Sequence, residues 1–479
     1  MKGKTLPNGW KLETLGNLSS AIQYGYTAKA QAEPVGPRLL RITDIQNDMV
    51  RWEEVPFCKI KKEEKQKYLL APNDILFART GATVGKSYLI RDQVPDSVFA
   101  SYLIRVRLMG EVTPKYVAYF FKSTDYWRQI TESQAGIGQP NVNGTKLAQI
   151  EIPVAPPNQQ QRIVAEIEKQ FSRLDEAVAN LKRVKANLKR YKASVLKAAV
   201  EGKLTADWRK QHPDVEPATK LLERILTQRQ KSWQSKRKYK EPFELDTTAL
   251  PLLPKRWIWA PLDAISDAIG GFAFESKKFT STGFQVLKMA NIRMGRIDIS
   301  QKPSFIQDVE ADVIAKYSLM DGDLVVTLTG TRKKQDYGYV AVVRNAKELL
   351  LNQRIARLRL ADGVLPQFLA FVLQSDNYRN RFFAYETGNV GQGNVGMGAV
   401  TKAPITLAPF AEQEQIVAEM ECRRSLIEEL EAALEANLTR AERLRQSILA
   451  TAFAGKLVIT NPARMMRAGT DIQMTRSLQ

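Results

Sequence analysis

The chain has 479 residues, about three times the length of a typical domain, so it is expected to fold as more than one unit. Its 71 lysine and arginine residues exceed its 51 acidic residues by 20, which favours a polyanionic partner such as nucleic acid or an anionic membrane surface. A hydrophobic fraction of 44% excludes disorder as the main state, and two distant cysteines with a single histidine exclude a disulfide framework and a zinc cluster.

The N-terminal residues lack the apolar run of a signal peptide, and no stretch approaches the roughly 18 apolar residues that cross a bilayer. We therefore expect a soluble protein of the reducing cytoplasm, with no membrane partner.

The first region of the chain is predicted to be a mixture of strands and helices. Short apolar runs at residues 87–90 and 102–108 predict strands, and residues 113–130 predict a helix. Residues 158–201 then contain neither proline nor glycine, and apolar residues recur at every seventh position. This spacing favours a long helix in a coiled coil, with these residues at its contact: Ile167, Leu174, Leu181, Leu188 and Val195.

A basic connector follows the first long helix. Residues 203–241 hold eleven positive and five negative side chains, with a predicted helix after Pro217 and a basic run at 236–240 that we interpret as a solvated linker. The single histidine, His212, precedes a proline and is interpreted as a solvated loop residue. The chain therefore offers almost no candidate for general-base catalysis by histidine.

The second half of the chain repeats the first. Trp10 recurs as Trp257, the segment 74–81 recurs as 323–330, and the segment 161–166 recurs as 414–419, in the same order and with nearly constant spacing. Residues 412–454 repeat the helix pattern without proline or glycine, with apolar positions at Met420, Ile427, Leu434, Ala441 and Ile448. The tail beyond Val458 is polar and is expected to fray.

Charge predicts how the two long helices pair. Residues 181–197 carry seven positive and no negative side chains, whereas residues 412–429 carry six negative ones against two arginines. Antiparallel pairing brings these complementary halves together, and parallel pairing would oppose like charges. Two independent surface helices are the alternative.

Motifs for catalysis were sought and not found. Residues 81–87 resemble a phosphate-binding loop, but only three residues separate its glycines where the motif needs four, and the second copy lacks the lysine and serine. Residues 81–87 are better read as a turn between strands whose glycines permit it. The glycine clusters at 136–139 and 388–396 lack the strand-then-helix context of a dinucleotide site. No methyltransferase tetrapeptide, nuclease acidic set or nucleophile elbow is present, so we expect a non-catalytic chain.

Candidate DNA contacts are basic and amide side chains that lie near aromatic residues. Lysine and arginine neutralise phosphates, whereas arginine, asparagine and glutamine can read purine edges in the major groove. Taken singly, each basic residue is more often solvated surface. The candidates are Arg38, Arg41, Lys59, Lys61, Lys62, Arg79, Lys86, Gln139 and Asn141 in the first copy, and Arg293, Arg332, Lys333, Lys334, Arg354, Gln392 and Asn394 in the second.

Several repeated segments resemble one protein family. The segments 139–163 and 393–416, the Leu-Pro-x-x-Trp openings, the Asp-Ile-Leu-Phe-Ala-Arg-Thr-Gly segment at 74–81 and the segment 194–204 are similar to those of specificity subunits of type I restriction-modification systems. The sequence departs from the pattern at residues 158–159, where the usual acidic residue is absent, and at Leu328, where the first copy has Arg79.

This resemblance implies a mixed α/β fold with two similar target-recognition domains, separated by two long antiparallel coiled-coil helices and related by internal pseudo-two-fold symmetry. The expected boundaries are recognition domains at 1–157 and 253–410, spacer helices at 158–201 and 411–457, a connector at 202–252 and a flexible tail at 458–479.

The resemblance also implies a function. Each recognition domain is expected to read half of an asymmetric, interrupted site in double-stranded DNA. The chain itself is expected to be non-catalytic and to carry no cofactor. Two adenine-N6 methyltransferase subunits would bring S-adenosylmethionine, and two restriction subunits, where the host has them, would bring ATP and magnesium.

Two other functions compete with this one. The chain could be a fused methyltransferase or nuclease whose motifs have drifted, in which case the purified chain alone would methylate or cut DNA. It could instead be a coiled-coil interaction protein that binds nucleic acid without specificity. Competition by random duplex separates this reading from specific recognition.

Overall fold

The computed structural model describes residues 6–91, 93–133, 141–233, 239, 241–389 and 391–458. They divide into two compact units: unit 1 comprises Met1–Arg183 with Ala433–Gln479, and unit 2 comprises Val184–Ala432. Each unit contains one globular region and part of each of two long helices, α5 (Pro157–Val200) and α13 (Phe410–Phe453).

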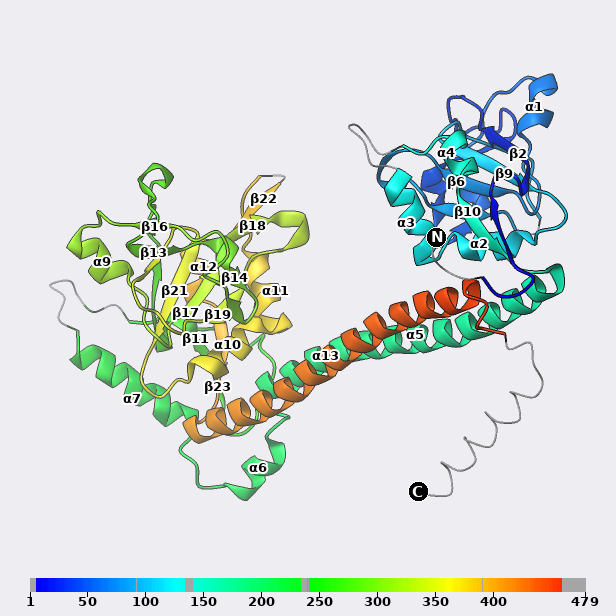
Figure 1. The fold of residues 1–479 in the computed structure, drawn as a ribbon. Coiled ribbons are helices and arrows are strands. Elements are labelled where there is room, and N and C mark those ends of the chain that lie inside the picture. The colour runs from blue at the N-terminus through cyan, green and yellow to red at the C-terminus, as the bar shows by residue number, and fades with distance from the viewer. Residues whose placement is uncertain are drawn as a thin grey trace, which may run out of the picture. The chain divides into compact units, whose positions relative to one another are not determined.

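Unit 1 is built on a four-stranded antiparallel sheet in the order β2-β9-β6-β7 (Figure 1). Every residue of the central strand β6 is buried, as the unbroken apolar run Ile-Leu-Phe-Ala requires. The globular region of unit 1 contains β1 (Lys11–Thr14), β2 (Ser19–Tyr24), β3 (Arg38–Leu40), β4 (Ile45–Gln46), β5 (Met49–Val50), α1 (Lys62–Tyr68), β6 (Ile75–Ala78), β7 (Ser87–Leu89), β8 (Ser97–Phe99), β9 (Leu103–Leu108), α2 (Pro114–Phe120), α3 (Thr124–Ser133), α4 (Gly144–Ala148) and β10 (Glu151–Val154).

Unit 2 repeats this topology. Its four-stranded sheet has the order β12-β21-β17-β19, the pair β11-β23 matches β1-β10, and the parallel pair β13-β20 matches β3-β8. Its elements are α6 (Ala206–Gln211), α7 (Ala218–Lys231), β11 (Ile258–Pro261), α8 (Leu262–Ile265), β12 (Ser266–Gly270), β13 (Phe284–Leu287), β14 (Ile292–Arg293), β15 (Arg296–Ile297), β16 (Phe305–Ile306), α9 (Ala311–Tyr317), β17 (Leu324–Thr327), β18 (Thr329–Thr331), β19 (Val340–Val342), β20 (Leu349–Leu351), β21 (Ile355–Leu360), α10 (Pro366–Gln374), α11 (Asp376–Ala384), β22 (Gln392–Asn394), α12 (Met397–Thr401) and β23 (Pro404–Leu407).

The mixed α/β prediction is confirmed, with one local correction. The single helix expected at residues 113–130 is two helices, α2 and α3. The break occurs at Ser123, whose buried hydroxyl accepts the backbone N–H of Tyr126 at 3.3 Å and so begins a new helix. Ser375 accepts from Tyr378 in the same way between α10 and α11.

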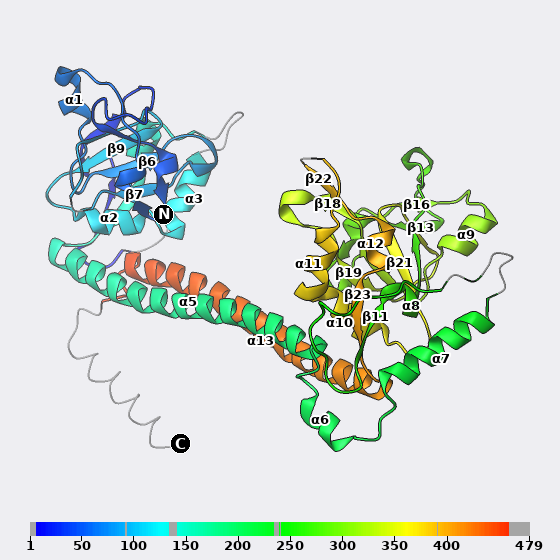
Figure 2. The ribbon, with the colours of Figure 1, turned by 180° about the vertical axis from the view of Figure 1, so that it is seen from behind.

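The connector helix packs on unit 2. The expected helix after Pro217 is α7, and Figure 2 shows it beside the short helix α8. Leu221 and Ile225 of α7 are buried in the same core as Leu262 and Ile265 of α8. Of the basic run at 236–240 the structure describes only Tyr239, and the expected tail beyond Val458 lies outside the described residues.

The long helices pair antiparallel, as charge predicted. In unit 1, Arg445 near the end of α13 forms an ion pair with Asp175 of α5. In unit 2, Lys192 near the end of α5 lies 3.8 Å from Glu431 of α13, so the chain directions are opposed. The side chains of Lys192 and Glu431 are about half exposed, and such a pair contributes little stability but selects the orientation.

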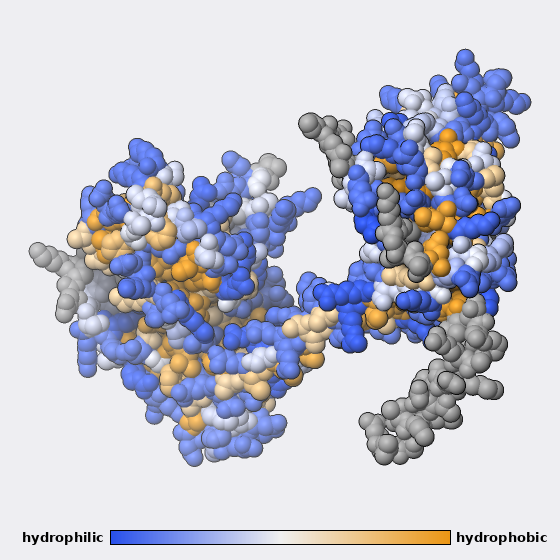
Figure 3. Space-filling model, in the orientation of Figure 1, coloured by the Kyte–Doolittle hydropathy of each residue, from blue (hydrophilic) through white to orange (hydrophobic). Residues whose placement is uncertain are grey.

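The heptad positions are shielded from solvent along both long helices. Other apolar side chains of these helices, such as Val184 and Leu426, stay exposed, and on the face that Figure 3 shows, hydrophobic residues lie in patches among hydrophilic ones. Of the heptad residues, Ile167, Leu188, Val195, Ile427, Leu434 and Ala441 are buried, and Leu174, Leu181, Met420 and Ile448 are half-buried. In the part of the chain that the structure describes, we find no helix with the length and apolar character to cross a membrane.

Removing one buried heptad side chain should destabilise the protein. Ile427→Ala leaves a cavity at a position that is 3% exposed, so we expect the free energy of unfolding to fall by about 2 kcal/mol. The neighbouring Leu426, which is 54% exposed, provides the matched control, because Leu426→Ala should change it by less than about 0.5 kcal/mol. Urea unfolding measures both, and equal effects would contradict the packing described.

Candidate nucleic-acid interface

A buried glutamine fastens each long helix to the globular region before it. In unit 1 the side-chain oxygen of Gln160 accepts the N–H of Thr113 at 2.8 Å, and its nitrogen donates to the carbonyl of Ala155 at 2.8 Å. In unit 2 the same atoms of Gln413 bond Leu365 at 2.9 Å and Ala408 at 2.9 Å.

Thr113 and Leu365 are the N-cap residues of α2 and α10, so each glutamine satisfies a backbone donor next to a helix start. Both glutamines are almost fully buried. The repeated closing segment is therefore a structural joint, and its glutamine is buried.

The residue before this glutamine differs between the units. In unit 2 it is Glu412, which is 1% exposed and accepts hydrogen bonds from Trp257 at 2.9 Å, Thr205 at 2.6 Å and Arg209 at 3.0 Å. The guanidinium of Arg209 and the two neutral donors offset the cost of burying the Glu412 carboxylate.

In unit 1 the equivalent residue is the neutral Gln159, whose side-chain oxygen accepts from Trp10 at 3.0 Å. Val458 stands in the segment after α13 at the position of Thr205, so no hydroxyl is offered there. The departure from the family pattern at residues 158–159 is thus a matched loss: the carboxylate is replaced by a neutral amide where the threonine hydroxyl is replaced by valine.

The acidic residue that begins each Asp-Ile-Leu-Phe or Asp-Leu-Val-Val strand is also structural. Asp74 is buried and accepts from Arg107 at 2.7 Å, and Asp323 accepts from Arg359 at 2.9 Å. The hydrogen bond from Arg359 to Asp323 raises the pKa of this guanidinium. Among the described residues, no group of three histidine, cysteine or acidic side chains could hold a metal ion.

A threonine and an exposed asparagine form the same strand contact in both units. Thr80 pairs with Asn141 in unit 1, and Thr329 pairs with Asn394 between β18 and β22 in unit 2. We call these two pairs the Thr–Asn platforms. Next to each, the residue after the asparagine donates its N–H to the residue before the threonine: Val142 to Arg79 at 3.0 Å and Val395 to Leu328 at 2.9 Å.

Arg79 lies against an aromatic ring beside the platform of unit 1. Its guanidinium stacks 4.8 Å from the ring centre of Tyr24, and its Nε is buried without a hydrogen-bond partner. The Tyr24 hydroxyl accepts the N–H of Gly144 at 2.7 Å, which fixes the ring. The aromatic face supports the guanidinium, whose N–H groups make no hydrogen bond with a described residue.

The loop after Arg79 is a tight turn between β6 and β7, in agreement with its reading as a glycine-permitted turn. Residues Gly81–Thr83 form a 3-10 turn, and Gly85 has a φ of +87°. A Cβ on Gly85 would lie 2.8 Å from the ring of Trp127, so this position needs glycine for both reasons. Lys86 is exposed on the same loop.

In unit 2 the platform borders an open hollow of about 380 Å³. The exposed Arg354 lies there with a φ of +70°, a conformation that a residue other than glycine adopts uncommonly. Amide and small residues complete the lining, which consists of Thr329, Arg354, Gly388, Asn389, Gln392 and Asn394. A second open hollow, of about 570 Å³, shares Thr329 and Gln392 and includes Arg293.

The other basic candidates of unit 2 differ in how far the fold engages them. Arg332 pairs with Glu386 at 2.8 Å, and Arg293 donates to the carbonyls of Ala290 and Ile292, both at 2.9 Å. Lys333 and Lys334 are exposed in the 3-10 turn Arg332–Lys334.

The remaining candidates of unit 1 lie away from the platform contacts. Arg38 donates to the carbonyl of Val55 at 2.7 Å, and Arg41 pairs with Asp44 at 2.7 Å, a hydrogen bond that raises the pKa of Arg41. The lysines Lys59, Lys61 and Lys62 are exposed, and Gln139 lies outside the described residues. Roles in DNA binding for all of these stay predictions.

The sequence did not single out several residues that the structure places at the platforms. Thr80 and Thr329 occupy the same position in the repeated segments 74–81 and 323–330, so comparison of the two copies could have identified them. Tyr24 ends β2 and Tyr102 lies in the turn before β9, in segments that differ between the copies. Their proximity to Arg79 comes from the pairing of β2 and β6 with β9.

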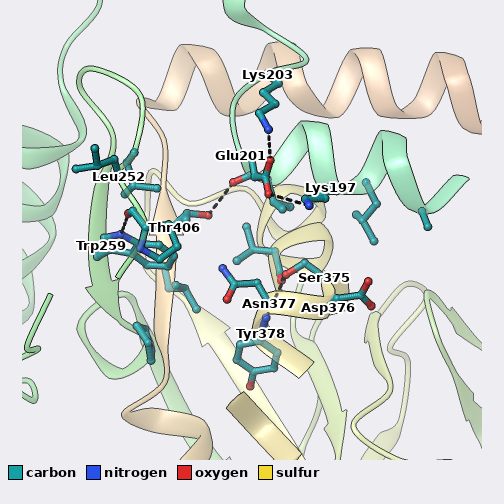
Figure 4. Close-up of a pocket in the computed structure, with 18 residues that line it drawn as sticks. Lys197, Glu201, Lys203, Leu252, Trp259, Ser375, Asp376, Asn377, Tyr378 and Thr406 are labelled. Atoms are coloured by element: carbon teal, nitrogen blue, oxygen red, sulfur yellow. Dashed lines mark hydrogen bonds and ion pairs between the residues drawn. The ribbon is translucent and has the colours of Figure 1, made fainter. Parts of the chain in front are cut away.

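A further hollow, of about 530 Å³, lies in unit 2 among the end of α5, α10, α11 and β23 (Figure 4). In unit 1 the equivalent place is filled by Phe453, whose ring packs 5.1 Å from Tyr116 and 5.2 Å from Phe120. Alignment of the repeats puts Val200 at the position of Phe453 and Val372 at that of Phe120. Two valines in unit 2 therefore stand where unit 1 has two phenylalanines, and they leave room in this hollow.

The two units offer a matched test of this packing. Phe453→Val should lower the free energy of unfolding by about 2 kcal/mol, because it empties an aromatic contact that is buried in unit 1. Val200→Phe should raise it by about 1 kcal/mol, because the hollow has room for the ring. Thermal and urea unfolding measure both. A loss of stability in Val200→Phe would show that the hollow cannot accept a ring.

Comparison with known proteins identifies similar chains. Residues 9–190 match a family model described as the type I restriction modification DNA specificity domain. The chain is 26% identical over 473 residues to the EcoKI specificity subunit of Escherichia coli K12, covering 95% of this chain and 91% of that subunit. It is 24% identical over 467 residues to the StySPI specificity subunit of Salmonella potsdam, covering 95% and 90%.

Two solved structures have a similar fold. One, from a study of complex assembly and conformational transition of a type I restriction-modification system, aligns with a TM-score of 0.63 at 18% identity and covers 94% of this chain and 99% of its own. The HsdS subunit of Thermoanaerobacter tengcongensis aligns with a TM-score of 0.54 at 17% identity and covers 95% and 99%.

Proposed function

Because the chain belongs to the family of type I restriction-modification specificity subunits, we propose that it selects the DNA sequence on which a type I restriction-modification complex acts. The observation that carries this proposal is the recurrence of one exposed polar arrangement in both units. Each Thr–Asn platform has an exposed asparagine and an arginine beside it, and each unit carries exposed lysines. These are the side chains that read base edges and neutralise phosphates.

Each unit then reads one half of a bipartite site. The common sheet and platform support a common mode of docking, while the differing side chains around the platforms support two different half-sites. Both long helices contribute residues to both units, which supports a role for them as the spacer that sets the gap between the half-sites.

We infer that catalysis belongs to partner subunits. The sequence lacks the motifs of methyltransferases and nucleases, so two methyltransferase subunits would supply S-adenosylmethionine and the reaction on adenine. Two restriction subunits, where the host has them, would supply ATP-driven activity with magnesium. The chain would act in the cytoplasm, where the chromosome is accessible.

Selection from a randomised DNA library tests the proposal directly. The full chain, incubated with duplexes of random sequence at ~150 mM salt, should enrich a motif of two defined blocks separated by an undefined gap. Binding to this motif should exceed binding to random duplex at least about 1,000-fold. Enrichment of no motif, with binding that weakens equally on all duplexes as salt rises, would indicate a non-specific nucleic-acid-binding protein with a coiled coil instead.

Exchange of residues 1–157 for those of a relative should change only one block of the motif. The reason is that these residues supply the globular region of unit 1 and leave unit 2 intact. The same library selection provides the measurement. If both blocks changed, or neither did, the division of recognition between the units would be wrong.

Lengthening the helices should lengthen the gap. One heptad inserted after Arg183 in α5 and one after Ala432 in α13 adds about 10 Å to each helix, or about three base pairs of DNA. The two blocks should stay unchanged while the gap grows by about three base pairs. An unchanged gap would contradict the spacer role.

A further inference from the structure

Two positions beside the platforms exchange an arginine between the units. In unit 1, Arg79 donates its backbone N–H to the carbonyl of Tyr102 at 3.2 Å. In unit 2 the equivalent residue Leu328 donates to the carbonyl of Arg354 at 2.8 Å. Unit 1 therefore has arginine then tyrosine at the two positions, and unit 2 has leucine then arginine.

Each unit thus presents one arginine next to its Thr–Asn platform. In unit 1 the arginine is the residue that donates the backbone hydrogen bond, and in unit 2 it is the residue whose carbonyl accepts it. Leu328 is only 7% exposed, so the first position in unit 2 is closed by an apolar side chain. Tyr102 is 64% exposed, so the second position in unit 1 offers an aromatic face.

The surroundings of Arg354 suit a base edge better than a phosphate. Its guanidinium is exposed and makes no hydrogen bond or ion pair with the described residues, while the neighbouring Arg332 is held by Glu386. Asn389, Gln392 and Asn394 line the same hollow, and amides read base edges. The exposed Lys333 and Lys334 are flexible point charges of the kind that contact phosphates.

Arg79 is presented differently but with the same chemistry. The ring of Tyr24, whose centre lies 4.8 Å from the guanidinium carbon, supports it, and the hydroxyl of that ring accepts the backbone N–H of Gly144. A guanidinium fixed in one plane can donate two parallel hydrogen bonds to O6 and N7 of guanine, which is the commonest specific contact of arginine with DNA.

Resting on the proposed function, we propose that the arginine beside each platform reads a guanine: Arg79 in the half-site of unit 1 and Arg354 in the half-site of unit 2. Arg79 and Arg354 lie on opposite sides of the equivalent backbone contact in the two units. The guanine would therefore stand at a different position, relative to the bases that the platform contacts, in each half-site.

Arg354→Gln tests the inference in unit 2. Selection of the full-length variant from a randomised duplex library should replace one guanine by adenine in one block, because glutamine pairs with N6 and N7 of adenine. The other block should be unchanged. Binding to the wild-type motif should fall about 10-fold to 100-fold, measured by competition. Arg79→Gln should produce the corresponding change in the other block.

Arg344→Gln is the matched control. Arg344 is exposed and lies two residues after β19. The antiparallel register of β19 with β17 places it near the start of β17, whereas the platform follows the end of β17. Its loss removes the same charge and should leave both blocks of the motif unchanged. Lys333→Gln should weaken binding to all duplexes by a similar factor, as loss of a phosphate contact does.

The outcomes separate the inference from the proposed function. If the wild-type chain enriches no bipartite motif, the proposed function fails. If the wild type enriches one and Arg354→Gln either keeps it or weakens all duplexes alike, the function stands and the guanine assignment is wrong. Arg354→Asn guards against misfolding, because asparagine tolerates the positive φ and can also pair with adenine.

Discussion

The architecture depends on the joint between each globular region and the long helix that follows it. Gln160 and Gln413 make this joint with both ends of one amide, bonding the carbonyl before the helix and the N-cap backbone of α2 or α10. Both glutamine side chains are almost fully buried, so a side chain that met only one of these backbone groups would leave the other without its partner. Glutamine has the length and the two functions that the joint requires, which explains why it recurs in both copies.

This joint fixes the direction in which each sheet meets its helix, and the platforms follow from the sheet. Thr80 and Thr329 lie two residues after the ends of the central strands β6 and β17, whose buried residues cannot shift without disturbing the core. At the start of each of these strands an aspartate accepts a hydrogen bond from an arginine: Asp74 from Arg107, and Asp323 from Arg359. A strand anchored at one end and buried along its length presents the same exposed positions in both units, whatever side chains occupy them.

Much of this could be predicted from the sequence, because the duplication aligned the parts and the heptads are long. The antiparallel orientation followed from complementary charge in the two helices, and the strands 87–90 and 102–108 followed from apolar runs flanked by turns. The division of 113–130 into α2 and α3 could not be predicted so easily, since it depends on the single hydroxyl of Ser123.

The platform was harder still to predict. Arg79 and Tyr102 are 23 residues apart, and Arg354 lies 38 residues before Gln392, so only strand pairing brings such residues together. Among the basic candidates, the sequence could not separate Arg41, which forms an ion pair with Asp44, from Arg354, which forms none with a described residue. Which arginines are paired depends on side-chain positions that the folded chain sets.

The two copies act as controls for each other, and their differences fall into two kinds. Inside the fold, changes are compensated: Gln159 replaces Glu412 where Val458 replaces Thr205, so charge and donor are lost together. The aromatic contact of Phe453 with Phe120 is likewise replaced by Val200 with Val372, on both sides of one contact.

At the platforms the arginine moves from one side of a contact to the other. Leu328, which replaces Arg79 in unit 2, is buried in the hydrophobic core, and Arg79 lies against the ring of Tyr24. The exposed Arg354 makes no hydrogen bond or ion pair with a described residue. Under the proposed function, a side chain such as that of Arg354 is set by the DNA that its unit binds, and the difference between the units would correspond to a difference between the half-sites.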